Sequence, residues 1–450
     1  MKFMLRKLLL SLFFIFIFSK NLAQRGFKFY GKNPAKQEVK FKLINNLIVL
    51  PLVINGKELS FILDTGVNKT ILFNLTKNDS LGLNEISKIT LQGLGSGEPV
   101  EALLSQNNRF NIKDMISSNQ DLYVILRDNF NISAKMGITI HGIIGYDLLK
   151  NVIAKINYNH KTITFYNPEK YFLKKCRKCE EFPLEFYRNK PYINAKIQID
   201  TVENKTTDVK LLIDSGGSDA LWLFENTKEE IKTPKKYFQD VLGEGLSGTI
   251  YGNRSKISKI SLGDFEIKNP TVSFLDSLST HHARRFQERN GSVGGAILKR
   301  FKVWLDYPNN KMIIKKNSSL KKAFYYNMSG LHVVYSGQEL VKEQGITKVN
   351  NPYGYKGETS NNKTISFITS YHYKFKPSYK IDHVLEGSPG DNAGIEKGDV
   401  IKRINGRPAH TYSLDEITHL FLSKPNKKIK IEVERLGMRL KFEFILKKRI

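Results

Sequence analysis

Two short turns with matching residue types carry the side chains best suited to chemistry. Asp64-Thr65-Gly66 follows an apolar run at 61–63, and Asp214-Ser215-Gly216 follows an apolar run at 211–213, with 150 residues between the two acids. In each case a buried strand would deliver a carboxylate into a tight turn that glycine accommodates easily. Two carboxylates held close together cannot both ionise, so one acts as a base and the other as an acid toward a shared water. Such a pair can hydrolyse a peptide bond without a metal or a covalent nucleophile.

The elements that must position these turns are themselves repeated. Each turn is preceded by strands, and in the first half an Asn55-Gly56 hairpin joins two of them. Further along each half lies an apolar segment that ends in glycine, at 143–145 and at 292–294. The short strands between turn residues predict a mostly β protein with two lobes, at 41–167 and 186–317. A local twofold between the lobes would bring the turns face to face, so that Thr65 and Ser215 hydrogen-bond across to the opposite turn.

Glycine-rich tips follow a strand in each half. The first contains Gly93, Gly95, Ser96 and Gly97, and its counterpart spans 241–248. We expect the first tip to be a mobile flap over the acidic pair, with a plain surface turn as the alternative for either tip.

The paired turns resemble those of the pepsin and retropepsin superfamily of aspartic proteases, in its two-lobed single-chain form. The resemblance covers residues 41–317 and implies an aspartic endopeptidase that acts on polypeptide substrates and needs no cofactor. It implies that Asp64 and Asp214 are catalytic and that the dyad is supported by Thr65, Gly66, Ser215 and Gly216. Because both acids lie in one chain, a monomer would suffice.

Three positions depart from that family. Val67 and Gly217 stand where the family usually has Ser or Ala after the glycine, and Ser292 replaces an apolar residue. A hydroxyl after the glycine would donate to the carboxylate and lower its pKa. Its absence predicts activity nearer neutral pH than in pepsin-like enzymes.

The region 325–450 resembles a PDZ domain with an insertion at about 342–378. The resemblance rests on glycine-containing turns at 387–390, 393–395, 398–399 and 404–406, and on a helix that Ser413 would cap. It implies binding of peptides or protein C-termini, with Gly330, Leu331, His332 and Val333 aligned to the loop that captures a terminal carboxylate. His332 stands where glycine is usual, and a rigid brace for the second lobe is the alternative. A PDZ domain after a secreted aspartic protease is similar to a group of bacterial proteins.

The N-terminus predicts export. Three basic residues precede an apolar run at 8–18, so residues 1–23 resemble a signal peptide, with an uncleaved anchor as the alternative. The protein would then be periplasmic or extracellular, without an integral membrane span after signal cleavage. Residues 24–40 are expected to form a leader. Residues 168–185 are expected to form a linker or edge strand, whose Cys176 and Cys179 form a local disulfide or remain thiols.

Several other functions are disfavoured. The net charge is +28, but lysines are scattered along the chain without an arginine and aromatic stripe, so we expect no nucleic acid partner. No cysteine and histidine pattern calls for a metal, and His141, His281 and His282 are expected to be solvated or hydrogen-bonded. Asp214-Ser215-Gly216-Gly217 also imitates a serine-protease loop, but no matching histidine motif precedes it. A peptide-binding scaffold that keeps the fold without cleaving remains the main competing hypothesis.

Overall fold

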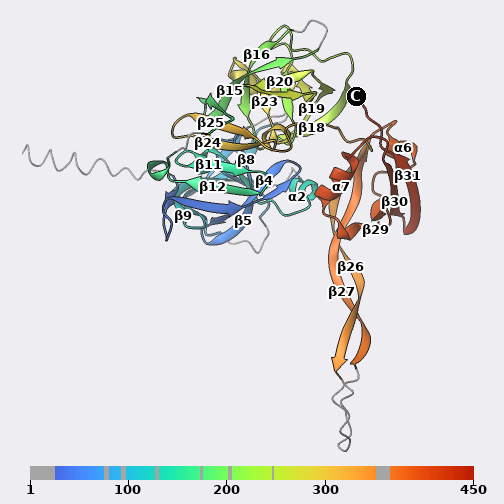
Figure 1. Ribbon diagram of the computed structural model, residues 1–450. Coiled ribbons are helices and arrows are strands. Elements are labelled where there is room, and N and C mark those ends of the chain that lie inside the picture. The colour runs from blue at the N-terminus through green and yellow to red at the C-terminus, as the bar shows by residue number, and fades with distance from the viewer. Residues whose placement is uncertain are drawn as a thin grey trace, which may run out of the picture. The chain divides into compact units, whose positions relative to one another are not determined.

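The computed structural model describes residues 26–75, 81–92, 98–126, 131–172, 176–200, 205–245, 248–350 and 365–450. Within these residues the chain is mostly β (Figure 1). It divides into two compact units. Unit 1 comprises the chain up to Phe130 together with Ile140–Phe324, and unit 2 comprises Asn131–Thr139 together with Tyr325–Arg449. The flap candidates Gly93, Gly95, Ser96 and Gly97 and the proposed signal peptide lie outside the described residues.

The first lobe of unit 1 is built on a nine-stranded sheet. The strands lie in the order β1 (Lys28–Phe29), β9 (Met115–Val124), β6 (Ile71–Leu72), β10 (Gly142–Ile144), β5 (Lys57–Leu63), β4 (Leu47–Ile54), β8 (Val100–Ile112) and β7 (Ile86–Leu91), with β3 (Lys42–Ile44) on β4. The β4–β5 hairpin turns at Asn55 and Gly56, which both have positive φ, 48° and 91°. The Asn-Gly pair predicted this turn, because both residue types tolerate the left-handed region.

The second lobe repeats this arrangement in a ten-stranded sheet. Its order is β18 (Phe238–Gly245), β19 (Gly248–Lys256), β22 (Thr271–Leu275), β17 (Leu221–Phe224), β23 (Arg289–Val293), β16 (Thr207–Ile213), β15 (Lys190–Gln198), β20 (Lys259–Leu262) and β21 (Phe265–Lys268), with β14 (Glu185–Tyr187) on β15. In lobe 1, β10 pairs parallel with β5 and antiparallel with β6. In lobe 2, β23 pairs in the same two ways with β16 and β17. Short helices follow at equivalent places, α3 (Tyr146–Leu149) and α5 (Gly295–Leu298).

A six-stranded sheet joins the two lobes. Its order is β13 (Cys179–Pro183), β25 (Lys311–Lys316), β24 (Phe301–Asp306), β11 (Ile153–Asn157), β12 (Thr162–Tyr166) and β2 (Lys36–Lys40). The pairing of β11 with β24 crosses from one lobe to the other. One continuous core of buried residues, including Phe165 and Val303, fills both lobes. The lobes therefore form one folded body.

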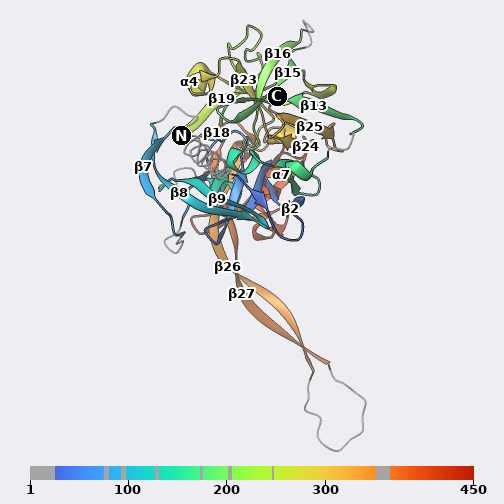
Figure 2. The ribbon, with the colours of Figure 1, turned by 90° about the vertical axis from the view of Figure 1, so that its left-hand side faces the viewer.

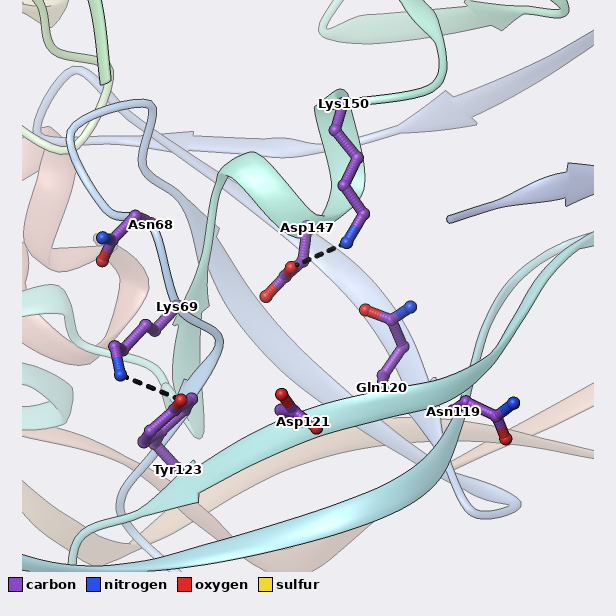
Figure 3. Close-up of a pocket in the computed structure, with 8 residues that line it drawn as sticks. All are labelled: Asn68, Lys69, Asn119, Gln120, Asp121, Tyr123, Asp147 and Lys150. Atoms are coloured by element: carbon purple, nitrogen blue, oxygen red, sulfur yellow. Dashed lines mark hydrogen bonds and ion pairs between the residues drawn. The ribbon is translucent and has the colours of Figure 1, made fainter. Parts of the chain in front are cut away.

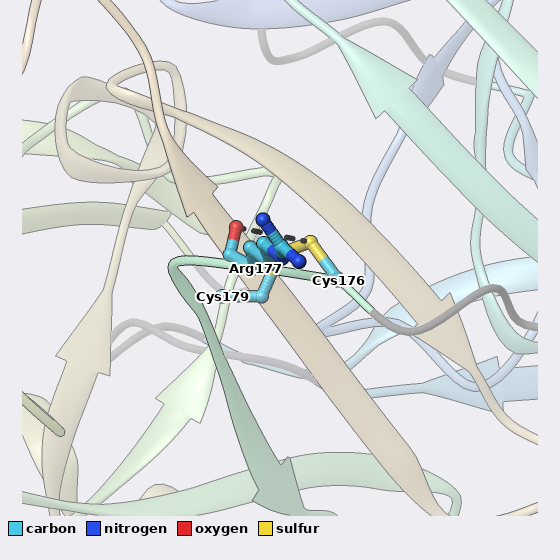
Figure 4. The surroundings of a disulfide bond; sticks show 3 residues. All are labelled: Cys176, Arg177 and Cys179. Atoms are coloured by element: carbon cyan, nitrogen blue, oxygen red, sulfur yellow. Dashed lines mark hydrogen bonds between the residues drawn. A yellow bond between two sulfur atoms is a disulfide. The ribbon is translucent and has the colours of Figure 1, made fainter.

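Both stretches expected to connect or lead into lobes contribute strands to this sheet. The stretch 24–40 supplies β2 at one edge, and 168–185 supplies β13 at the other, after a short 3-10 helix η1 (Pro168–Lys170). Cys176 and Cys179 form a disulfide just before β13 (Figure 4). The remaining elements of lobe 2 are α4 (Ser277–Thr280) and η2 (Ala283–Arg285). No helix in the described part of the chain is both long and apolar enough to cross a membrane.

Unit 2 has its own sheet and core. The sheet order is β26 (Leu331–Asn350), β27 (Ile365–Val384), β28 (Val400–Ile404), β30 (Lys428–Arg435) and β31 (Met438–Ile445), with β29 (Arg407–Pro408) on β28. The helices are α2 (Ile132–Met136), α6 (Pro389–Asn392), η3 (Ala409–Thr411) and α7 (Leu414–Phe421). Ser413 caps α7 in a capping box with Glu416, as the sequence predicts. The expected insertion is the outer part of β26 and β27, a long two-stranded ribbon (Figure 2).

Candidate active site

The two acidic turns are tied together across the lobes. The Thr65 hydroxyl donates to the Ile213 carbonyl at 2.6 Å and accepts from the Ser215 amide at 2.9 Å. Reciprocally, the Ser215 hydroxyl donates to the Leu63 carbonyl at 2.7 Å and accepts from the Thr65 amide at 3.0 Å. Both hydroxyl residues are buried, with 1% and 2% of their surface exposed. These four bonds, which the duplicated sequence predicts, hold the turns face to face.

The carboxyl groups of Asp64 and Asp214 lie over the glycines of these turns. The amide of Gly66 donates to Asp64 Oδ1 at 2.7 Å, and the amide of Gly216 donates to Asp214 Oδ1 at 3.1 Å. A Cβ added to Gly216 would overlap the Asp64 carboxyl group, and one added to Gly66 would lie 3.4 Å from Asp214 Oδ1. Each turn therefore contacts the acid of the opposite lobe. Glycine is needed here for close approach, because a side chain would push the carboxyl groups apart.

The segments ending in glycine hydrogen-bond to the backbone of the two acidic turns. The amide of Asp64 donates to the Ile144 carbonyl at 2.9 Å, and the amide of Asp214 donates to the Val293 carbonyl at 2.9 Å. A Cβ on Gly145 would overlap the carbonyl of Asp64, and β10 continues directly into this glycine. The repeated apolar-apolar-glycine pattern thus has a steric cause in lobe 1. In lobe 2, a Cβ on Gly294 would overlap the carbonyl of Asp219 and crowd that of Gly217.

The two carboxyl groups differ in their surroundings. Burial and the negative charge of Asp214 raise the pKa of Asp64 from 3.8 to about 7. Burial also raises the pKa of Asp214, but the positive charges of Arg289 and Lys190 and the amides of the turn oppose this increase. Asp64 is therefore the member of the pair that keeps its proton, and Asp214 is the member that ionises first.

Arg289 and Lys190 are charged residues near Asp214 that the sequence did not single out. Arg289 is 3% exposed, and its Nη2 donates to Ser292 Oγ at 2.7 Å while its Nε donates to the Gly291 carbonyl at 3.2 Å. Burial lowers the pKa of Arg289, and Tyr192 and the negative charge of Asp214 oppose this decrease. A buried cation without an ion pair is costly, so the negative dyad nearby is its natural counter-charge. The one signal in the sequence was Ser292, a polar residue at an apolar position.

A small hollow beside the dyad is lined by Asp214, Gly217, Asp219, Trp222, Ser292 and Gly294. Asp219 accepts hydrogen bonds from Trp222 Nε1 at 2.8 Å and from Ser273 Oγ at 2.8 Å. Arg254 on β19 contacts Asp219 at 2.9 Å and Asp240 on β18 at 2.6 Å. These ion pairs fasten the β18–β19 hairpin of lobe 2, the counterpart of the expected flap, to the loop that carries Asp214.

A larger polar pocket in lobe 1 lies apart from the acidic pair. It has a volume of about 80 Å³ and is lined by Asn68, Lys69, Asn119, Gln120, Asp121, Tyr123, Asp147 and Lys150 (Figure 3). Lys150 is ion-paired with Asp147 at 3.0 Å, and Lys69 donates to the Tyr123 hydroxyl at 2.9 Å. Its lysines are thus already engaged by partners within the pocket. In the described residues, no cluster of three or more His, Cys, Asp or Glu could hold a metal ion.

The expected carboxylate-binding residues of unit 2 lie where a loop enters β26. Gly330 has φ 75°, and a Cβ there would overlap Ser388. Leu331 is buried at 1% exposure, and its amide donates to Ser329 Oγ at 3.0 Å. His332 and Val333 continue into the pairing with β27. The loop is present, but the Leu331 amide already has a partner within it.

Comparison with known proteins agrees with this description. A family model described as aspartyl protease matches residues 50–148 and again 197–298, and a PDZ domain model matches residues 380–435. A solved structure, the aspartic proteinase from Irpex lacteus, is 13% identical with a TM-score of 0.43, covering 64% of this chain and 99% of that chain. A search of curated proteins found no match.

Each of the two stretches matched by the aspartyl protease model contains one of the paired acidic turns. The chain carries an aspartyl protease domain, matched once in each lobe, followed by a C-terminal PDZ domain.

Proposed function

We propose that this chain is an aspartic endopeptidase in which Asp64 and Asp214 hydrolyse peptide bonds through a shared water. The observation that carries the proposal is the reciprocal bonding of Thr65 and Ser215, which fixes two unequal carboxyl groups beside each other. A fold kept only for binding would not need the two acids to differ in protonation.

The unequal surroundings suggest a role for each acid. Asp214, which ionises first, would take a proton from the water as that water attacks the peptide carbonyl carbon. Asp64, which keeps its proton up to about pH 7, would donate a hydrogen bond to the carbonyl oxygen as negative charge develops there. The proton taken by Asp214 would then pass to the leaving amine. Activity therefore requires Asp214 ionised and Asp64 protonated.

Digestion of a peptide library tests this proposal. The chain without residues 1–23 is expected to cleave library members, while Asp64→Asn and Asp214→Asn variants are expected to lose at least 1,000-fold in kcat/KM, or about 4 kcal/mol of transition-state stabilisation. Folding of each variant is checked by circular dichroism. If the parent chain cleaves nothing between pH 3 and 8, the peptide-binding scaffold is the better description.

We also propose that the PDZ domain binds peptides or protein C-termini and that the chain is exported and acts as a monomer. The loop at Gly330 and the resemblance to secreted bacterial proteins support this. A peptide with a free C-terminal carboxylate is expected to bind more tightly than its amidated form, because only the carboxylate accepts from the loop amides. N-terminal sequencing of the mature protein is expected to begin at residue 24, in the periplasm or outside the cell.

A further inference from the structure

The outer part of β26 and β27 is a ribbon with two open edges. A β-bulge between Tyr335 and Gln338, where Gly337 has φ 100°, marks its start. β27 pairs with β28 only at Tyr379 and Lys380. In the described residues, β26 pairs with β27 alone. Beyond the bulge, each strand therefore has one unpaired row of backbone N–H and C=O groups.

One face of the ribbon carries an aromatic stripe. Leu340 lies opposite Phe375, Lys342 opposite Tyr373, and Gln344 opposite Tyr371, so these side chains share one face. The large apolar side chains are all well exposed: Leu340 57%, Tyr371 55%, Tyr373 62% and Phe375 69%. Lys342 Nζ lies 3.9 Å from the centre of the Tyr371 ring. We call Leu340, Tyr371, Tyr373 and Phe375 the aromatic stripe.

The opposite face is suited to water. Glu343 is ion-paired with Lys374 at 3.0 Å and with Lys376 at 2.8 Å, and Glu339 is ion-paired with Lys402 at 2.9 Å. Ion pairs on this face keep it polar while the aromatic stripe stays uncovered. A two-stranded ribbon is marginally stable alone in water, and a contiguous exposed apolar patch marks an interaction site.

We propose that the ribbon binds extended, unfolded polypeptide by strand addition along the outer edge of β27, the strand that carries Tyr371, Tyr373 and Phe375. The added strand would pair with the free N–H and C=O groups, and its alternate apolar side chains would cover the aromatic stripe. A polypeptide is favoured because the edge needs a partner with backbone donors and acceptors, which lipid tails lack. β27 also ends at Val384, which pairs with Leu331 in the loop aligned with peptide capture.

The inference rests on the proposed function only in making the bound polypeptide a substrate. A ribbon that holds unfolded chains would raise the effective concentration of substrate near the protease domain, because both belong to one chain. Binding itself needs no catalysis, and the test is therefore made with a chain that cannot cleave.

The experiment uses the full mature chain carrying Asp64→Asn and a fluorescein-labelled protein kept unfolded by reduction and alkylation. Fluorescence anisotropy measures the Kd. The combined change Tyr371→Ser, Tyr373→Ser and Phe375→Ser is expected to raise the Kd at least tenfold. The matched control, His372→Ser with Lys374→Ser, changes the opposite face of the same strand and is expected to alter the Kd less than twofold. Circular dichroism checks that both variants keep the fold.

Each other outcome would overturn the proposal. An equal Kd for both variants would mean that the stripe does not contact the polypeptide. If the stripe variant loses binding to vesicles of phosphatidylcholine and phosphatidylglycerol but keeps binding to the unfolded protein, the aromatic stripe is a lipid-binding surface. A dimer in sedimentation that only the stripe variant abolishes would assign it to a second copy of the chain. Because Asp64→Asn protein is used throughout, failure of cleavage by the parent chain leaves this result unaffected.

Discussion

Thr65 and Ser215 hold each other's turn: each hydroxyl accepts from the other residue's amide and donates to the carbonyl that precedes the opposite aspartate. The burial classes of residues 61–70 are repeated residue by residue at 211–220, so the two turns sit in equivalent surroundings. The dyad is thus a property of the interface between lobes, and neither lobe holds it alone.

The first prediction concerns Thr65→Val. The substitution keeps the side-chain shape but leaves the buried Ser215 amide and Ile213 carbonyl without partners, at about 1–3 kcal/mol for each group. We expect unit 1 to lose about 2–4 kcal/mol of stability and kcat to fall at least tenfold, because the carboxyl groups are no longer aligned. Urea unfolding followed by tryptophan fluorescence measures the stability, since both tryptophans, Trp222 and Trp304, lie in unit 1.

The control for this change is Thr65→Ser, which restores the hydroxyl and copies the turn of lobe 2. It is expected to retain most of the stability and activity. Equal losses in the Val and Ser variants would contradict the prediction, because the Ser variant keeps the hydroxyl and should keep its hydrogen bonds.

The second prediction concerns Gly217. A Cβ at this position would lie 3.3 Å from Asp214 Oδ2, so the hydroxyl of Gly217→Ser can donate to the ionised carboxylate. That bond favours the charged form and lowers the pKa of Asp214. The acid limb of the pH profile of kcat/KM is therefore expected to move to lower pH, by roughly one unit. Gly217→Ala places the same Cβ without a donor, and a shift of equal size in that variant would contradict the hydrogen-bond explanation.

The third prediction concerns Arg289→Met, which is expected to shift the acid limb of the pH profile in the direction opposite to that of Gly217→Ser. Removing its positive charge in Arg289→Met takes away the largest influence that opposes burial, so the pKa of Asp214 rises and the acid limb moves to higher pH, by roughly one unit. The titratable groups that face Asp214 are Asp64, Lys190, Tyr192 and Arg289, and Lys190 stays in place in the variant. A pH profile of kcat/KM measures the shift.

Ser292→Ala serves as the comparison for Arg289→Met. It removes the acceptor of the Arg289 guanidinium but leaves the charge in place. The acid limb of its pH profile is expected to stay within about 0.3 pH unit of the parent, because one pKa unit corresponds to about 1.4 kcal/mol and the charge near Asp214 is unchanged. If both variants move the limb equally, the effect comes from local packing and not from the positive charge of Arg289.

The sequence predicted those parts of the site that local pattern determines. The acid, hydroxyl and glycine of each turn follow from a buried strand that ends in a tight turn, and Ser413 with Glu416 predicts the start of α7. Arg289 could not be assigned in this way, because its place beside Asp214 depends on the parallel pairing of β23 with β16, across about 80 residues of chain. Nothing near Arg289 in the sequence indicates that pairing.

The strands at the edges were harder to predict for a different reason. The stretches 24–40 and 168–185 are polar, because β2 and β13 are edge strands that bury only one side. In the ribbon, Tyr371, Tyr373 and Phe375 alternate with polar residues, which is a strand pattern. The stretch 342–378 as a whole is polar and rich in Gly, Asn, Lys and Tyr, and this composition predicts an insertion instead.

The last prediction concerns the stability of unit 1 as a function of pH. The pKa of Asp64 is about 7 in the folded chain and has an ordinary value of 3.8, so the folded state favours the protonated form. Its contribution to stability is therefore complete below about pH 4 and is lost as the pH rises to about 7. At about 1.4 kcal/mol per pKa unit, the free energy of unfolding that is lost is on the order of 4 kcal/mol. Asp64→Asn carries no charge at any pH. Relative to the parent, it is expected to be more stable at pH 8 and nearly equal at pH 4.

Urea midpoints from tryptophan fluorescence at pH 4, 6 and 8 measure this difference. Asp208→Asn is the control for removing an acid elsewhere in unit 1: Asp208 lies in β16, the strand that leads to Asp214, and its side chain is 78% exposed. The Asp208 variant is expected to follow the parent at all three pH values, since an exposed carboxylate contributes little. If the Asp64→Asn variant shows the same dependence of stability on pH as the parent, the Asp64 carboxyl group of the parent ionises as readily in the folded chain as in the unfolded one. In that case Asp64 cannot be the acid of the dyad near neutral pH, and its role and that of Asp214 would have to be exchanged.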